Sequence, residues 1–181
     1  MTDHVAVLLP SPWVARWAGL IPPGGRVLDV AAGEGRHARY LADLGHAVEA
    51  VDRDAEALAK ARGQGIATRA ADLEGGSWPY AGAAFDGIVV CNYLWRTLLP
   101  RILEALAPRG VLIYETFAVG NERHGRPSNP DFLLRPGELL EAVRGRLAVV
   151  AFEQGFVSRP KPAGVQRICA VNAGGEYSLG T

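Results

Sequence analysis

The sequence predicts an α/β protein with a doubly wound, mostly parallel β-sheet and an antiparallel addition at its end. From residue 26 onward, short runs rich in valine, leucine and isoleucine alternate with segments of helical periodicity, a pattern typical of strand–helix–strand units. The last two apolar runs, residues 147–152 and 165–171, have no helix between them. Strands joined without a crossover helix pair antiparallel, so these two runs predict the antiparallel addition.

The first half of the chain alternates strands and helices in a regular way. In the first predicted helix, Ala38, Leu41 and Leu44 fall on one face, as in an amphipathic helix. Asp54 follows the second strand and can cap the second helix. The predicted elements are, in order, a strand over 26–30, a helix over 36–44, a strand over 47–51, a helix from Asp54 to about 62 and a strand over 66–70.

The second half continues the alternation with longer elements. Residues 85–91 contain the unbroken apolar core Ile88, Val89 and Val90, which fits a strand buried on both faces. A helix is expected over 94–106, interrupted or started by Pro100, and another over 138–144 with Pro136 near its first turn. The remaining predicted elements are a strand over 110–117, a polar loop over 120–131 and the two closing strands.

Composition is that of one ordinary folded domain. The chain has 181 residues, of which 49% are hydrophobic and 21% charged, so it can bury a core. Lys and Arg total 19, as do Asp and Glu, so the formal net charge is zero. A neutral chain lacks the simplest reason to bind a nucleic acid or an acidic membrane surface.

The cellular setting is predicted from features that the chain lacks. Cys91 and Cys169 lie far apart in apolar runs and in no C-x-x-C pair, so no disulfide framework, zinc site or redox site is expected. The first ten residues have no basic region or long apolar region of a signal peptide. No apolar run approaches the roughly 18 residues that span a bilayer. We therefore expect a soluble, cytoplasmic protein.

Residues that can bind a nucleoside cofactor follow the first two strands. Gly33 and Gly35 come just after the first strand, where they permit a tight turn and close approach of backbone amides to a ligand. Asp52 ends the second strand, and a carboxylate there can accept both hydroxyls of a ribose. A sharp turn and a helix-capping acid would explain each feature alone. Because they occur in order, we expect a nucleoside cofactor at the carboxyl ends of the strands.

Two cofactor classes compete for this site. Gly33, Gly35, Ala38 and Asp52 also satisfy the dinucleotide fingerprint. Asp29 just before the turn argues against a pyrophosphate and favours the ammonium of an aminoacyl group. The segment Ala71-Asp72-Leu73 follows the third strand, where Asp72 could hydrogen-bond an adenine amino group beside Leu73. The alternative for Asp72 is a solvated loop acid. The chain also ends about where a dehydrogenase would need its catalytic domain.

Several of these segments together resemble a known family. Residues 27–35 (VLDVAAGEG), 51–52 (VD), 71–73 (ADL), 85–93 (FDGIVVCNY) and 106–113 (LAPRGVLI) resemble, in order and spacing, the motifs of class I S-adenosylmethionine-dependent methyltransferases. The resemblance covers residues 26–172. It implies a Rossmann-like sheet of seven strands whose last strand is antiparallel. It also implies a single methyltransferase domain over 1–181, with a cap segment over 1–25 and a core over 26–172.

The resemblance assigns cofactor roles to named positions. Carried across, the Gly33–Gly35 turn with Asp29 would hold the methionine part of S-adenosylmethionine, and Asp52 would bind the ribose. Asp72 and Leu73 would bind the adenine, while Cys91 and Asn92 would line the sulfonium end. The complete predicted cofactor set is Asp29, Ala31, Gly33, Gly35, Asp52, Asp72, Leu73, Cys91 and Asn92.

Candidate catalytic residues lie near the same strand ends. Methyl transfer needs alignment and exclusion of water more than a dedicated base. We single out Tyr93, Glu115 and His124, with core packing as the alternative for Tyr93 and a solvated loop position as the alternative for His124. Weaker candidates are Trp95, Arg96, Asn121, Glu122 and Arg123.

The remaining histidines carry no strong functional signal. His37 follows the glycine turn and has either a cofactor contact or a role on the helix face. His4 and His46 have no partners at metal-ligand spacing, so no metal site is predicted.

The predicted acceptor of the methyl group is a small molecule. Residues 92–95 (NYLW) lack the Asn/Asp-Pro-Pro-Tyr/Phe pattern of amino-group methylases acting on nucleic-acid bases or protein glutamine. Residues 114–117 (YETF) through 132–139 (FLLRPGEL) loosely resemble small bacterial methyltransferases, including the tellurite-resistance type, without implying their substrate. Trp13 and Trp17 predict an amphipathic helix over 12–20, either above the pocket or packed on the sheet edge. The loop over 120–131 is long enough to be a lid.

Two other functions stay open at this point. A nucleotide-dependent oxidoreductase would share the glycine turn and Asp52. A regulatory protein that binds S-adenosylmethionine without catalysis would share the complete cofactor set. The sequence alone does not separate cofactor binding from turnover.

Overall fold

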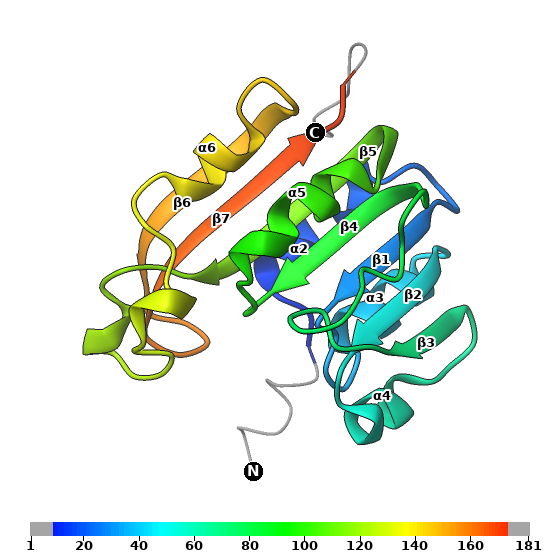
Figure 1. Cartoon of the computed structure of the whole chain (residues 1–181), viewed down its shortest axis with the longest axis horizontal. Helices are drawn as coiled ribbons and strands as arrows, with labels where there is room; N and C mark the ends of the chain where they lie inside the picture. The colour runs from blue at the N-terminus through cyan, green and yellow to red at the C-terminus, as the bar shows by residue number, and fades with distance from the viewer. Residues whose placement is uncertain (1–8, 174–181) are drawn as a thin grey trace.

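A computed structural model describes residues 9–173 as one seven-stranded sheet with helices on both faces (Figure 1). The strands are β1 (Arg26–Val30), β2 (Ala47–Asp52), β3 (Ile66–Ala70), β4 (Phe85–Cys91), β5 (Leu106–Phe117), β6 (Ala148–Val157) and β7 (Ala163–Val171). The helices are α2 (Pro12–Trp17), α3 (Arg36–Asp43), α4 (Ala55–Ala61), α5 (Leu99–Glu104) and α6 (Glu138–Val143). Short 3-10 turns are η1 (Ala18–Leu20), η2 (Arg96–Leu98), η3 (Asn121–Arg123) and η4 (Pro130–Phe132). His4 and the first part of the predicted cap segment lie outside the described residues.

The strand order confirms the predicted fold class. The sheet runs β3-β2-β1-β4-β5-β7-β6, and the first five of these strands are parallel neighbours. β7 pairs antiparallel with both β5 and β6, as the missing helix between the last two strands predicts. The chain leaves β1 toward β2 on one side and returns to β4 on the other. The carboxyl ends of β1 and β4 therefore border a topological switch point.

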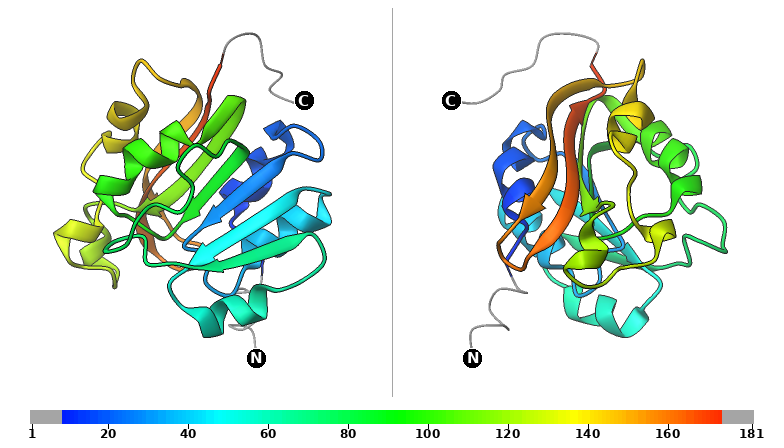
Figure 2. Two further views of the ribbon diagram at one scale, coloured as in Figure 1. Left: turned by 45° about the vertical axis from the view of Figure 1, so that its right-hand side comes forward. Right: turned by 90° about the vertical axis from the view of Figure 1, so that its left-hand side faces the viewer.

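Alternating side chains of the strands build a core on each face of the sheet. On one face, Leu28, Ile88 and Leu112 pack in a cluster with α5 and α6, and on the other, Val27 and Val89 pack in a cluster with α2, α3 and α4. The edge-on view in Figure 2 shows α2 and α6 on opposite sides of the sheet. Six of the seven residues of β4 are buried, which confirms a central strand covered on both faces.

Three element boundaries differ from the prediction. The helix expected over 94–106 begins at Leu99, since Pro100 takes a first-turn position of α5 and a 3-10 turn precedes it. β5 begins at Leu106 instead of 110, because Leu106 already pairs with Phe85. Residues 107–110 of β5 lie opposite the single residue Asp86 of β4 in a register shift, and a positive φ of 67° at Arg109 accommodates them. β6 continues to Val157 and forms a long hairpin with β7.

The predicted N-terminal helix packs on the sheet. Trp13 is 1% exposed, and its indole Nε1 donates a hydrogen bond to the Ile168 carbonyl at 3.2 Å. Trp17, one turn further, is only partly buried, and its buried Nε1 has no hydrogen-bond partner among residues 9–173. α2 packs against the face of β5, which is an interior strand, so the placement on the sheet edge is wrong.

No helix among residues 9–173 combines the length and apolar character needed to cross a membrane. Both cysteines are buried and form no disulfide.

We expect Trp13→Ala to lower the free energy of unfolding by about 3–5 kcal/mol, because it leaves a cavity and removes the hydrogen bond to the Ile168 carbonyl. Trp17→Ala is the matched control, since it removes the same side chain from the same helix at a less buried position. Its cost should be smaller by at least about 1 kcal/mol. Denaturant titrations of the three proteins measure both effects, and equal losses for the two variants would contradict the anchoring role of Trp13.

Candidate functional site

The glycine turn after β1 is tied to the end of β2. The Gly33 amide donates to Asp52 Oδ2 at 2.8 Å, and the Asp54 amide donates to Asp52 Oδ1 at 3.0 Å. The turn needs glycine for two different reasons. Gly35 has φ +76°, and a Cβ there would lie 2.4 Å from Ala61 Cβ of α4, whereas Gly33 has φ +54° and open space where its Cβ would be. Gly35 therefore serves packing, and Gly33 leaves room for a ligand.

A pocket of about 260 Å³ opens beside this turn, across the carboxyl ends of β1, β2, β3 and β4. We call it the acidic pocket. Its lining is Ala31, Asp52, Arg53, Ala71, Asp72, Leu73, Glu74, Asn92 and Tyr93. Three of these residues are carboxylates and one is a cation, Arg53. The pocket therefore favours positively charged or neutral ligands over phosphates.

The structure brings together some of the predicted cofactor residues and leaves others outside the lining. Those in the lining are Ala31, Asp52, Asp72, Leu73 and Asn92. Those outside it are Asp29, Gly33, Gly35 and Cys91. Of the predicted catalytic residues, only Tyr93 lines the acidic pocket.

Arg53, Ala71 and Glu74 line the pocket and were not among the sequence candidates. Each lies within two positions of a predicted residue. Arg53 and Ala71 directly follow β2 and β3, which was the signal available in the sequence for these two residues.

Two lining residues have strained backbone. Ala31 has φ 54° and Asn92 has φ 55°, in the left-handed region that residues other than glycine seldom adopt. They follow β1 and β4, so they face each other across the switch point. Such strain persists only where the surrounding structure enforces it, and it gathers at binding sites.

Asp72 is an ionised carboxylate at the pocket mouth. The Glu74 amide donates to its Oδ1 at 3.0 Å, and this hydrogen bond lowers the pKa of Asp72. The exposed side chain therefore presents a hydrogen-bond acceptor next to the buried Leu73.

Asp29 lies beneath the turn, where it is 1% exposed. Its Oδ2 accepts a hydrogen bond from the Ala38 amide at 3.0 Å, in the first turn of α3. Burial disfavours the charged form and raises the pKa of Asp29 to about 7. Asp29 thus combines a structural hydrogen bond with a carboxyl group that titrates near neutral pH.

His37 belongs to the contacts that hold the start of α2. Its Nε2 accepts a hydrogen bond from the Ser11 amide at 3.1 Å. Burial, together with the charge of Arg36, lowers the pKa of His37 to about 3, so the ring is neutral at physiological pH. Of the two roles left open for this residue, the structure supports a structural one.

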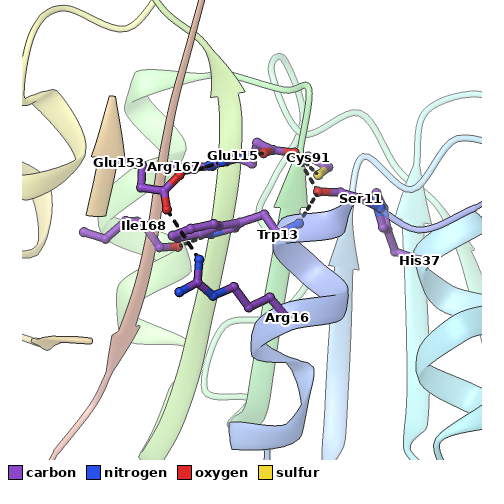
Figure 3. A network of polar contacts seen from close by, with 9 residues as sticks. All are labelled: Ser11, Trp13, Arg16, His37, Cys91, Glu115, Glu153, Arg167 and Ile168. Carbon is purple, nitrogen blue, oxygen red and sulfur yellow. Dashed lines mark hydrogen bonds and ion pairs between the residues drawn. The ribbon is translucent and has the colours of Figure 1, made fainter. Parts of the chain in front are cut away.

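Glu115 is held in a polar network on the α2 side of the sheet (Figure 3). The Ser11 hydroxyl donates to Glu115 Oε1 at 2.7 Å, and Arg167 Nη1 donates to Oε2 at 3.0 Å. Arg167 also pairs with Glu153, and its guanidinium lies 4.8 Å from the centre of the Trp13 ring. Both Glu115 oxygens are engaged, and the residue is not part of the acidic-pocket lining.

The other candidates after β4 and β5 hold the loop over 120–131. Arg96 pairs with Glu138 at 2.6 Å and donates to the carbonyls of Asp131 and Leu133. Asn121 is buried and bonded to the backbone of Pro127 and Gly164. These contacts give both residues structural roles.

His124 is exposed on the same loop. Its ring centre lies 4.6 Å from that of Phe156 in β6, and it is not part of the acidic-pocket lining. Trp95 is partly buried against the core. Glu122 accepts from the Gly120 amide, and Arg123 is exposed. In residues 9–173, no group of three or more His, Cys, Asp or Glu side chains could hold a metal ion.

Comparison with known sequences matches this site region to one family. Residues 27–110 match the model of a family described as a methyltransferase domain. Two curated relatives are malonyl-[acyl-carrier protein] O-methyltransferases, from Pectobacterium atrosepticum and Enterobacter lignolyticus. They are 36% identical over 104 residues and 34% identical over 99 residues, covering 54% and 51% of this chain. The matches cover 41% and 39% of the relatives, so they span about two fifths of those proteins.

Solved structures share the fold over most of the chain. TehB from Haemophilus influenzae superposes with a TM-score of 0.71 at 18% identity, covering 88% of this chain and 61% of TehB. An S-adenosylmethionine-dependent methyltransferase from Mesorhizobium loti superposes with a TM-score of 0.65 at 18% identity, covering 89% of this chain and 98% of that protein. The 1,6-didemethyltoxoflavin-N1-methyltransferase of Burkholderia thailandensis was solved with S-adenosylhomocysteine. It superposes with a TM-score of 0.66 at 23% identity, covering 95% of this chain and 80% of that protein. Residues 27–110, slightly less than half of the chain, are thus similar to a methyltransferase domain, and the described residues share the fold of these S-adenosylmethionine-dependent methyltransferases.

Proposed function

We propose that the protein is an enzyme that transfers a methyl group from S-adenosylmethionine to a small-molecule acceptor. The observation that carries this proposal is the acidic pocket, in which Asp52 and Asp72 end neighbouring parallel strands opposite Asn92 and Tyr93. We further propose a cytoplasmic location and a single domain, with its core over 26–172 and a cap over 1–25. The acceptor of the curated relatives is not carried over, because the matches cover only about two fifths of those proteins.

The residues present fit S-adenosylmethionine. Asp52 accepts one hydrogen bond on each oxygen, and a carboxylate has about four acceptor sites, so it can also accept both hydroxyls of a ribose. Asp72 and Leu73 offer an acceptor and an apolar contact for adenine. The open space at Gly33 leaves room for the methionine part beside the turn. In our proposal Gly35 and Asp29 hold that turn in place without lining the pocket, and Cys91 positions Asn92 at the end of β4.

The charge of the pocket argues against a dinucleotide. A pyrophosphate there would meet Asp52, Asp72 and Glu74 with only Arg53 to offset them. Burying like charges together is strongly unfavourable. A sulfonium ion carries the opposite charge, so the same carboxylates favour it.

The proposed mechanism assigns the protein mainly an aligning role. S-adenosylmethionine supplies an electrophilic methyl group bound to a positively charged sulfur. Asp52 and Asp72 would fix the nucleoside, and Asn92 and Tyr93 would border the place where the acceptor approaches. Holding the reactants in line provides most of the acceleration that such a displacement needs. Glu115 and His124, outside the acidic pocket, would act on the reaction only indirectly.

We expect Asp52→Ala to weaken S-adenosylhomocysteine binding by roughly 10- to 100-fold, because charge-assisted hydrogen bonds to the ribose are lost. Asp86→Ala is the matched control, since Asp86 accepts a backbone hydrogen bond from Arg26 at the opposite end of the sheet. Calorimetry with S-adenosylhomocysteine and with NAD measures both ligands. Tight binding of NAD without binding of S-adenosylhomocysteine would instead support an oxidoreductase. Binding of S-adenosylhomocysteine without methyl release over a metabolite panel would support a non-catalytic binding protein.

We also expect cofactor affinity to depend on the protonation of Asp29. With a pKa of about 7, this carboxyl is mostly protonated at pH 5.5 and largely ionised at pH 7.5. A nearby ammonium group stabilises the ionised form, so S-adenosylhomocysteine should bind roughly three- to tenfold more tightly at pH 7.5 than at pH 5.5. The ligand's own amino group, with a pKa of about 8, stays mostly protonated over this range.

Asp29→Asn removes the titrating group while keeping an acceptor for the Ala38 amide. Its affinity profile between pH 5.5 and 7.5 should be flat. A wild-type profile equally flat would contradict an action of Asp29 on the cofactor's ammonium group.

A further inference from the structure

A second pocket adjoins the acidic pocket and shares three residues with it. Glu74, Asn92 and Tyr93 line both. The second pocket has a volume of about 210 Å³, slightly smaller than the acidic pocket. A small molecule in it would therefore lie next to any ligand of the acidic pocket.

The lining of the second pocket is mainly apolar. Four of its eight lining residues are Leu94, Phe117, Pro127 and Phe132, and we call it the apolar pocket. Pro127 and Phe132 belong to the segment that follows β5, which Arg96 holds in place through the Asp131 and Leu133 carbonyls. Phe132 is 43% exposed, so it forms the rim.

The apolar pocket contains no compensating positive charge. Its lining residues, all in the described part of the chain, include the Glu74 carboxylate but no lysine, arginine or histidine. Arg96, close to this pocket in sequence, is already paired with Glu138. Glu74 itself is paired with Arg53 of the acidic pocket at 3.9 Å. An anionic acceptor would lose its hydration in an apolar lining that holds no cation, which is strongly unfavourable.

Tyr93 lines both pockets at their junction, and its buried hydroxyl has no partner within the described residues. Tyr93 Oη is inaccessible to solvent and makes no hydrogen bond in the described structure. Burial raises the pKa of Tyr93 above its ordinary value, so the group stays a neutral hydroxyl. Buried polar groups are rarely left unsatisfied, so a ligand whose binding moves the Tyr93 side chain enough to reach this hydroxyl would supply the missing partner.

We propose that the apolar pocket binds the methyl acceptor, and that this acceptor is a small, uncharged molecule with an apolar body and a hydroxyl or N–H nucleophile. This inference rests on the proposed methyltransferase function. The nucleophile's lone pair forms the bond to the methyl carbon, while the electron pair of the breaking C–S bond returns to sulfur. The proton that the nucleophile loses passes to the Glu74 carboxylate, whose side chain is 32% exposed, and from there to water.

The test compares two ligands of similar size and different charge. We would measure binding of 2-naphthol and 2-naphthoate to the full chain saturated with S-adenosylhomocysteine. We expect naphthol to bind at least about tenfold more tightly, because the naphthoate carboxylate would lose its hydration in a lining that has no lysine, arginine or histidine. Equal or tighter binding of naphthoate, or no binding of either ligand, would overturn the inference. Failure of S-adenosylhomocysteine itself to bind would instead overturn the proposed function.

Three variants locate the binding in the apolar pocket. Phe132→Arg places a cation at the rim, so it should reduce the preference for naphthol at least about threefold while cofactor affinity stays unchanged. Tyr93→Phe should weaken naphthol binding about three- to tenfold. Tyr80→Phe is its matched control, because Tyr80 packs against Trp78 and Phe85 outside both pocket linings, and it should leave naphthol binding unchanged. An unchanged naphthol preference in Phe132→Arg would place the ligand elsewhere and refute the assignment.

Discussion

The hydrogen bond from the Gly33 amide to Asp52 is the contact on which the rest of the site depends. It joins the turn after β1 to the end of β2 at 2.8 Å, so two segments that the chain separates by 19 positions form one rim. Gly35 fixes the other side of the turn by packing against Ala61 of α4. Since Asp52 keeps acceptor sites available, one carboxylate both shapes the turn and faces the pocket.

A second set of charges joins the N-terminal helix to the antiparallel end of the sheet. Glu115 and Arg167 are 15% and 21% exposed at their side chains, and each has further polar partners in Ser11 and Glu153. Buried charges are tolerated only when paired in this way. The network explains why Glu115, although it follows the apolar core of β5, is committed to holding α2 in place.

The elements and site residues that the sequence predicted well are determined by neighbouring residues. The contacts and boundaries that it missed are determined by residues far apart in the chain. Alternation and caps predicted β1 to β4, α3 and α4 nearly to the residue, because each has its signal within a few positions. The site residues Asp52 and Asp72 were predicted for the same reason, as strand ends. The contact of Ser11 with Glu115 spans 104 positions, and β5 starts early because of its pairing with Phe85. No local pattern encodes either feature.

In the proposed reaction, the acidic pocket serves cofactor binding, and the residues shared by the two pockets serve to accelerate methyl transfer. In this proposed reaction, the carboxylates of the acidic pocket stabilise the positive charge of the sulfonium most before transfer, when that charge is complete. They therefore tighten cofactor binding without lowering the barrier from the bound state. The barrier must fall through alignment at the junction, where the Tyr114 hydroxyl holds the Tyr93 carbonyl at 2.9 Å and Asn92 keeps its strained backbone. A rigid junction between a charged pocket and an apolar one suits a displacement in which charge disappears as the new bond forms.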